Sequence, residues 1–83
     1  MKATVCVTLK DSIHDPQGKA ILHALSALGF DGVKGVRAGK YFELDLSCES
    51  AETGETLLKE MCEKLLANTV IEKYHYEIHK GVS

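Results

Sequence analysis

The sequence predicts an α+β fold, a two-layer sandwich in which an antiparallel sheet carries two helices on one face. Three observations lead to this prediction. The apolar pattern changes along the chain in the order strand, helix, strand, helix, strand (β-α-β-α-β). The strand-like segments alternate apolar and polar residues, which is typical of antiparallel strands with one buried face. The chain has 83 residues, enough for a single domain, residues 1–83, with one core.

The first element, residues 2–10, is predicted to be a half-buried strand. Its sequence, KATVCVTLK, alternates without interruption, and successive strand side chains point to opposite faces. The residues expected on the buried face are Ala3, Val5, Val7 and Leu9. Those expected on the other face are Thr4, Cys6, Thr8 and Lys10.

A capped helix is expected over residues 14–30, HDPQGKAILHALSALGF. Asp15 is the predicted N-cap, because its carboxylate accepts hydrogen bonds from the unpaired amides of the first turn. Pro16 suits the first helical position, where no amide hydrogen bond is lost. Gly29 is expected in the left-handed conformation that ends helices, with Phe30 folding back on the last turn. The apolar stripe of this helix is Ile21, Ala24, Leu25 and Leu28.

The middle segment, residues 32–46 (GVKGVRAGKYFELDL), allows two interpretations. One continuous strand, bent near Gly39, keeps its apolar residues on one face, interrupted only by Lys40. These apolar residues are Val36, Ala38, Phe42, Leu44 and Leu46. A two-residue turn would reverse the faces of the first half, since a one-residue slip moves every side chain to the other side. A three-residue hairpin loop from Gly39 keeps the faces in agreement and gives a ferredoxin-like β-α-β-β-α-β fold. We expect the bent strand.

The second helix is expected over residues 48–68, CESAETGETLLKEMCEKLLAN. Ser50 is the predicted N-cap, and Asn68 is the expected left-handed stop. The apolar stripe is broad and comprises Leu57, Leu58, Met61, Cys62, Leu65 and Leu66.

The last element, residues 70–80 (VIEKYHYEIHK), is predicted to be a second alternating strand. One face is expected to carry Tyr74, Tyr76 and Ile78. The opposite face is expected to carry Lys73, His75, Glu77 and His79.

Composition limits the function classes. The formal net charge of −2 argues against nucleic-acid binding, which usually requires a basic excess. No run approaches the roughly 18 apolar residues of a membrane span, and the N-terminus does not resemble a signal peptide. Cys6, Cys48 and Cys62 are odd in number and widely spaced, as free thiols in a reducing cytoplasm would be. A domain of this size buries only about 60–65% of its extended-chain surface, which favours self-association.

No motif in the chain predicts chemistry of its own. The stretch GVRAGK partly matches a phosphate-binding loop, but an alternating strand follows where that loop must open a helix. His75 and His79 on one strand face lie roughly 13 Å apart at about 3.3 Å per residue, too far for one metal ion. Cys62 falls on a helix stripe and Cys6 on a strand, where packing accounts for both. We therefore expect no catalytic residue, metal site or cofactor in this chain.

The expected arrangement leaves one sheet face and the sheet edges uncovered. The uncovered face carries Thr4, Cys6, Thr8, Tyr41, Glu43, Lys73, His75 and Glu77. An exposed sheet edge is a template for pairing with another chain, so we expect a homodimer or a higher homo-oligomer. A small dimeric module that binds a regulatory ligand is the alternative. An acylphosphatase-type hydrolase is disfavoured, because the loop KDSIHDPQG contains no arginine.

Three blocks spread over nearly the whole chain carry a family resemblance. They are VTLK with DPQGKAI, LGF with VRAGKYFEL, and MCEKLLANTVIEKYHYEI. In this order they resemble the PurS family, the small subunits of phosphoribosylformylglycinamidine synthase in purine biosynthesis. The resemblance implies a non-catalytic subunit that bridges a large synthetase subunit and a glutaminase subunit as a dimer and supports ammonia passage between them.

The resemblance also implies a reaction and its cofactors. The complex converts formylglycinamide ribonucleotide, glutamine and ATP into formylglycinamidine ribonucleotide, glutamate, ADP and phosphate. ATP and magnesium are expected to be used by the large subunit, and none is expected on this chain. The matching blocks give the expected subunit-interface residues: Asp15, Pro16, Gln17, Gly18, Arg37, Gly39, Lys40, Asn68, Ile71 and Glu72.

Overall fold

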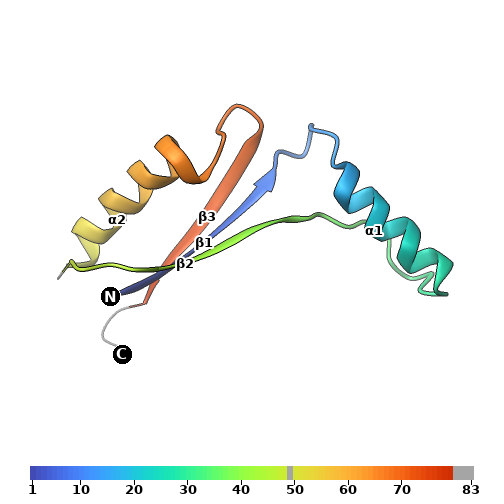
Figure 1. Cartoon of the computed structure of the whole chain (residues 1–83), viewed down its shortest axis with the longest axis horizontal. Helices are drawn as coiled ribbons and strands as arrows, with labels where there is room; N and C mark the ends of the chain where they lie inside the picture. The colour runs from blue at the N-terminus through green and yellow to red at the C-terminus, as the bar shows by residue number, and fades with distance from the viewer. Residues whose placement is uncertain (49, 80–83) are drawn as a thin grey trace.

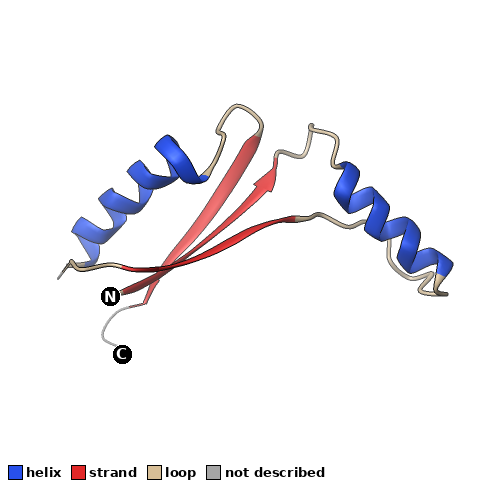
Figure 2. Cartoon of the chain, in the orientation of Figure 1, coloured by secondary structure: helices blue, strands red, loops and turns tan. Residues whose placement is uncertain are grey.

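The computed structural model describes residues 1–48 and 50–79 (Figure 1). The elements in chain order are β1 (Lys2–Leu9), α1 (Pro16–Ala27), β2 (Gly39–Asp45), α2 (Ala51–Met61), the π-helical turn η1 (Cys62–Leu66) and β3 (Glu72–His79). The β-α-β-α-β order and the α+β class are confirmed (Figure 2). Glu49 and Lys80, which belonged to the predicted second helix and last strand, lie outside the described residues.

The three strands form one antiparallel sheet in the order β2-β1-β3. β1 is central, and its Val5 pairs with Phe42 of β2 and with Tyr76 of β3. The middle segment is not a hairpin, as expected, but the expected continuous strand forms only in its second half. β2 and its pairing with β1 begin at Gly39, and residues 33–38 belong to no strand.

The core lies between the sheet and the helical segment of α2 and η1. Its fully buried side chains include Val5 and Val7 of β1, Leu58 of α2 and Cys62 of η1. Leu57 and Leu65, predicted for the same stripe, are instead exposed. The stripe drawn from sequence was too wide, because a three-stranded sheet covers only one narrow side of this helix.

Two tyrosine–glutamate hydrogen bonds join β3 to the helical segment above it. The Tyr74 hydroxyl donates to Glu63 Oε2 at 2.7 Å, and the Tyr76 hydroxyl donates to Glu55 Oε1 at 3.0 Å. The Glu63 carboxylate stabilises the neutral phenol and raises the pKa of Tyr74 to about 12. Both tyrosines lie on the face predicted for them, where Tyr74 pairs with Val7 and Tyr76 pairs with Val5 of the core.

The ends of the helices follow the predicted chemistry with one exception. Asp15 caps α1, Ser50 caps α2, and Gly29 has a φ of 95° after the last turn of α1. Asn68 is not left-handed, since the described residues include no non-glycine residue with positive φ. The side chain of Asn68 instead accepts from the amide of Val70 at 3.2 Å, forming a local turn.

The expectation that both helices pack on the sheet is wrong for α1. Figure 1 shows α2 over the sheet, whereas α1 lies beyond the end of the strands. Residues 33–38 continue the line of β2 and run beside α1. We call residues 16–38 the arm. Leu28 of the predicted stripe is 73% exposed. An apolar stripe predicts that a helix will be covered, but it does not specify which surface covers it.

The arm makes the chain elongated. Its dimensions are 49 × 30 × 14 Å and its radius of gyration is 16.1 Å. A compact domain of this length would have a radius of gyration of about 12 Å. The chain therefore has a small packed body, comprising the sheet with α2 and η1, and a projecting arm that contributes little to its core.

Candidate functional site

The residues predicted for a subunit interface gather at one end of the sheet. They come from three separated segments: the loop before α1, the chain leading into β2, and the turn before β3. We call this junction the arm root and define it as residues 10–18, 36–40 and 68–73. The sequence blocks that were widely separated in the chain are thus brought together where the arm meets the body (Figure 1).

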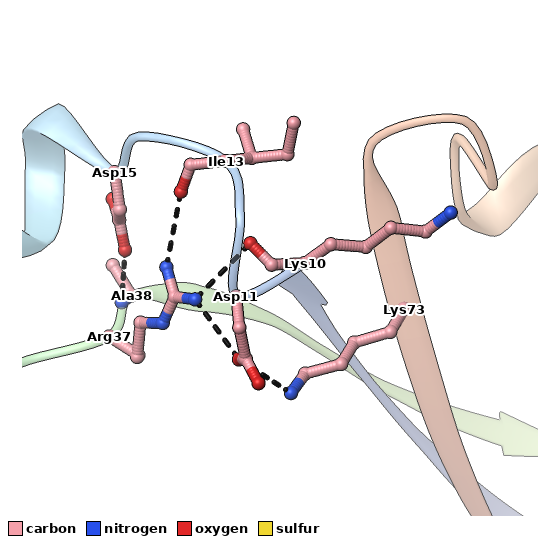
Figure 3. Close-up of polar contacts among 7 residues, drawn as sticks. All are labelled: Lys10, Asp11, Ile13, Asp15, Arg37, Ala38 and Lys73. Atoms are coloured by element: carbon pink, nitrogen blue, oxygen red, sulfur yellow. Dashed lines mark hydrogen bonds and ion pairs between the residues drawn. The ribbon is translucent and has the colours of Figure 1, made fainter.

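Asp15 is the buried polar residue at the centre of the arm root, with 8% of its surface exposed. Its Oδ1 accepts from the amide of Gly18 at 2.9 Å, and its Oδ2 accepts from the amide of Ala38 at 3.0 Å. These two bonds stabilise the charged form and lower the pKa of Asp15 below its ordinary value. One carboxylate therefore caps α1 and ties it to the chain that enters β2 (Figure 3).

Arg37 lies at the same junction (Figure 3). One terminal nitrogen, Nη2, donates to Asp11 Oδ1 at 3.1 Å and to the carbonyl of Lys10 at 3.2 Å. The other, Nη1, donates to the carbonyl of Ile13 at 3.5 Å. Because its five donors are spread in a rigid fork, one guanidinium holds several points of the loop before α1.

Asp11 links the arm to the edge strand β3. Its Oδ1 also accepts from Lys73 Nζ at 3.0 Å, so it is shared between Lys73 and Arg37. Hydrogen bonds from Lys73 and then from Arg37 lower the pKa of Asp11. The Asp11 side chain is 84% exposed, and exposed ion pairs contribute only about 0–1 kcal/mol. This link supports the junction more weakly than the buried carboxylate does.

The turn before β3 closes the arm root from the other side. The amide of Lys10 donates to the carbonyl of Ile71 at 2.8 Å, and the amide of Asn68 donates to Glu72 Oε1 at 2.7 Å. Lys40 Nζ lies 4.0 Å from Glu72 Oε2. These contacts join the third predicted block to the end of β1 and to β2.

Two of the ten predicted residues have mainly local roles. Pro16 occupies the first turn of α1, and Gln17 is exposed beside it. Gly39 is different, because it allows β2 to approach β1 closely. A Cβ atom at this position would lie 2.3 Å from the carbonyl oxygen of Val7. The bend glycine of the sequence is therefore a close-packing glycine at the start of the sheet.

Sequence reasoning missed two side chains of the arm root. Asp11 was not singled out, and Lys73 was assigned only to the uncovered sheet face. The period-2 pattern places Lys73 on that face correctly, but it gives no information on a partner 62 positions away. A charged residue directly after a strand, as in KDSIHDP, was the available signal for Asp11.

The described residues contain few features that suggest chemistry. Among residues 1–48 and 50–79, no group of three or more histidine, cysteine, aspartate or glutamate side chains is placed to hold a metal ion. Cys62 is buried, and this burial raises the pKa of its thiol. No helix in the same part of the chain is long and apolar enough to cross a membrane. The contacts described at the arm root join the arm to the body.

Comparison with known proteins gives a consistent result over almost the full chain. The PurS family model, described as phosphoribosylformylglycinamidine (FGAM) synthase, matches residues 2–80. Phosphoribosylformylglycinamidine synthase subunit PurS of Bacillus subtilis is 51% identical over 82 residues, which are 99% of this chain and 96% of that protein. The corresponding subunit of Archaeoglobus fulgidus is 50% identical over 74 residues, 89% of this chain and 92% of that protein.

Solved structures agree with the fold. The structure of B. subtilis PurS matches with a TM-score of 0.85 and 52% identity, covering 95% of this chain and 98% of that chain. A chain in the structure of PurLQS from Thermotoga maritima matches with a TM-score of 0.85 and 32% identity, covering 92% of this chain and 93% of that chain. The projecting arm is thus part of a fold seen in these relatives.

Proposed function

Since the chain belongs to the PurS family of phosphoribosylformylglycinamidine synthase subunits, we propose that it is the small subunit that bridges the large synthetase subunit and the glutaminase subunit. In this role it has no catalytic residue of its own. It supports the transfer of ammonia from the glutaminase, where glutamine is hydrolysed to glutamate, to the synthetase. There the ammonia is joined to formylglycinamide ribonucleotide in an ATP-dependent step.

The observation that carries this proposal is the similarity along the whole chain to subunits of one ligase complex. The Thermotoga maritima relatives are described as the PurS subunit of the synthase (EC 6.3.5.3) and as part of PurLQS. The elongated shape fits a subunit that acts by binding other subunits. Exposed apolar side chains on a projecting arm are unfavourable in water and are typical of a surface that binds another protein. ATP and magnesium are assigned to the large subunit.

We also propose that the chain forms a homodimer or a higher homo-oligomer. Ile21, Leu28 and Phe30 of the arm are exposed, and both β2 and β3 are edge strands. A second copy that covers both would bury the apolar side chains and pair the free backbone groups of the edge strands. The ten residues predicted from sequence, now placed in or beside the arm root, are proposed to lie at or next to subunit interfaces. The protein is expected in the cytoplasm.

The test is reconstitution with purified large and glutaminase subunits. We expect the chain alone to be inactive, and glutamine-dependent synthesis of formylglycinamidine ribonucleotide to require it. Turnover with ammonium salts in place of glutamine should depend on it much less, because free ammonia does not need transfer between subunits. Full glutamine-dependent turnover without this chain would contradict the proposal. Light scattering of the isolated chain measures its oligomeric state.

A further inference from the structure

We propose that Asp15 is a positioning residue for assembly: its carboxylate, bound to two separate backbone segments, fixes the direction in which the arm leaves the body. The inference rests on the proposed function as an assembly subunit and adds to it the part that orients the arm. It is carried by the geometry of the arm root, where a buried carboxylate joins segments 20 or more positions apart (Figure 3).

Two hydrogen bonds to Asp15 form the joint between α1 and the chain that enters β2. The two oxygens of Asp15 accept from Gly18 in the first turn of α1 and from Ala38 just before β2, at 2.9 and 3.0 Å. Hydrogen bonds to a charged acceptor are roughly twice as strong as neutral ones. Because Asp15 is buried, these bonds are also less weakened by water and salt than the exposed pair of Asp11 and Arg37.

These bonds accompany a close approach between the first turn of α1 and residues 36–38. A Cβ atom on Gly18 would lie 2.3 Å from the carbonyl oxygen of Val36 and 2.7 Å from Asp15 Oδ2. The first turn of α1 therefore rests directly on the backbone of residues 36–38. Since α1 makes no extensive contact with the strands in the described part of the chain, this joint sets its direction.

A loose joint would have its largest effect at the far end of the arm. α1 has 12 residues, so its last turn lies about 18 Å from the joint at 1.5 Å per residue. A rotation of about 20° would move that end by about 6 Å, which is more than one helical turn. Leu28 and Phe30 lie at this end, so their position relative to the body depends on the joint.

The variants Asp15→Asn and Ser50→Ala separate capping from positioning. Asparagine is as good an N-cap as aspartate, so α1 of Asp15→Asn stays capped. The asparagine amide presents a donor where Ala38 needs an acceptor, so the second bond is lost. Ser50→Ala removes the cap of α2. Among the hydrogen bonds described, the Ser50 hydroxyl contacts only Thr53, in the first turn of α2. This variant is the matched control for a lost side-chain bond at a helix start.

The measurement is the rate of glutamine-dependent turnover as each variant is titrated into the other two subunits. For Asp15→Asn we expect the concentration that gives half of the maximal rate to rise at least tenfold, with the rate at saturation unchanged. For Ser50→Ala we expect less than a twofold change. Circular dichroism at the same concentrations compares the melting temperatures of the two variants.

Each outcome decides between the two proposals. Equal curves for Asp15→Asn and Ser50→Ala would overturn the role of Asp15 while leaving the assembly function in place. A lower saturating rate at unchanged half-saturation would place Asp15 in ammonia transfer and also overturn positioning. If the wild-type chain does not stimulate turnover, the assembly function fails and the role of Asp15 fails with it.

A measurement on the wild-type protein covers the case in which Asp15→Asn does not fold. The amide proton shifts of Gly18 and Ala38 should titrate together, with a midpoint below the ordinary aspartate value of 3.8. Arg37 is a charged group near Asp15, and its positive charge also lowers the pKa of Asp15. An Ala38 shift that does not follow Asp15 would show that the tie between the two segments is absent.

Discussion

Gly39→Ala tests whether the glycine of the RAGK stretch is required for packing. The added Cβ would lie 2.3 Å from the carbonyl oxygen of Val7 and 2.7 Å from the Cγ2 of Thr8. The contact with Val7 is to backbone, so a rotamer change cannot relieve it. The φ of Gly39 is not positive, so the cost arises from close approach rather than from backbone conformation.

The expected cost follows from the movement that the methyl group requires. For the added methyl group to lie even 3.0 Å from the Val7 oxygen, the two atoms must move apart by about 0.7 Å. β1 and β2 must therefore separate where Gly39 pairs with Thr8. Overpacking of this kind typically costs about 1–3 kcal/mol. For a domain of this size, that lowers the melting temperature by about 5–20 °C. Thermal unfolding followed by circular dichroism, at one fixed protein concentration, measures the change.

Gly35→Ala is the matched control, since nothing lies within 4 Å of the position its Cβ would take. Its stability should change by no more than about 0.5 kcal/mol. The two variants have the same composition, and both change a glycine in the same segment. Equal melting temperatures for Gly39→Ala and Gly35→Ala would refute the close-packing explanation.

Three further predictions test the body of the protein. Leu58→Ala should cost about 2–5 kcal/mol in chemical denaturation, because Leu58 is fully buried. In an ultraviolet titration Tyr74 should ionise near 12, and Glu63→Gln should bring it closer to 10. Because the folded-state pKa is raised, its contribution to stability is complete below pH 10 and is lost as pH rises through about 12. A thiol reagent should modify Cys6 in the native protein but Cys62 only after unfolding, as judged by mass spectrometry.

The local structure was predictable because its determinants are local. Asp15 before Pro16, and Gly29 after the last turn of the first helix, satisfy backbone groups within four positions in the chain. The side-chain faces of β1 and β3 followed in the same way, since alternation depends only on residue parity. Parity also argued against a two-residue turn in the middle segment, but it left the three-residue hairpin open, and the pairing of β2 with β1 shows that no hairpin forms there.

The placement of the first helix could not be predicted, because it depends on contacts between distant residues. The stripe that includes Ile21 and Leu28 has the ordinary pattern of a helix that covers a sheet. The hydrogen bond that ties its start to the chain entering β2 joins Asp15 and Ala38, 23 positions apart, and no local pattern indicates it. The same limit applies to the candidate site: the sequence blocks gave most of its residues, but not that Lys73 and Arg37 share Asp11.

The division into body and arm separates two roles in a short chain: the body supplies a packed core, and the arm supplies the proposed contact surface. The body has its own core around Val5 and Leu58, and its strands are paired along most of their length. The arm has exposed leucine and phenylalanine side chains and a polar joint. Since the body does not cover these apolar side chains, a partner that buries them would stabilise the arm. Apolar contacts provide affinity without fixing a direction, whereas hydrogen bonds to a buried carboxylate are directional. An arm that combines the two holds its contact surface in place before a partner arrives, which lowers the ordering cost of assembly.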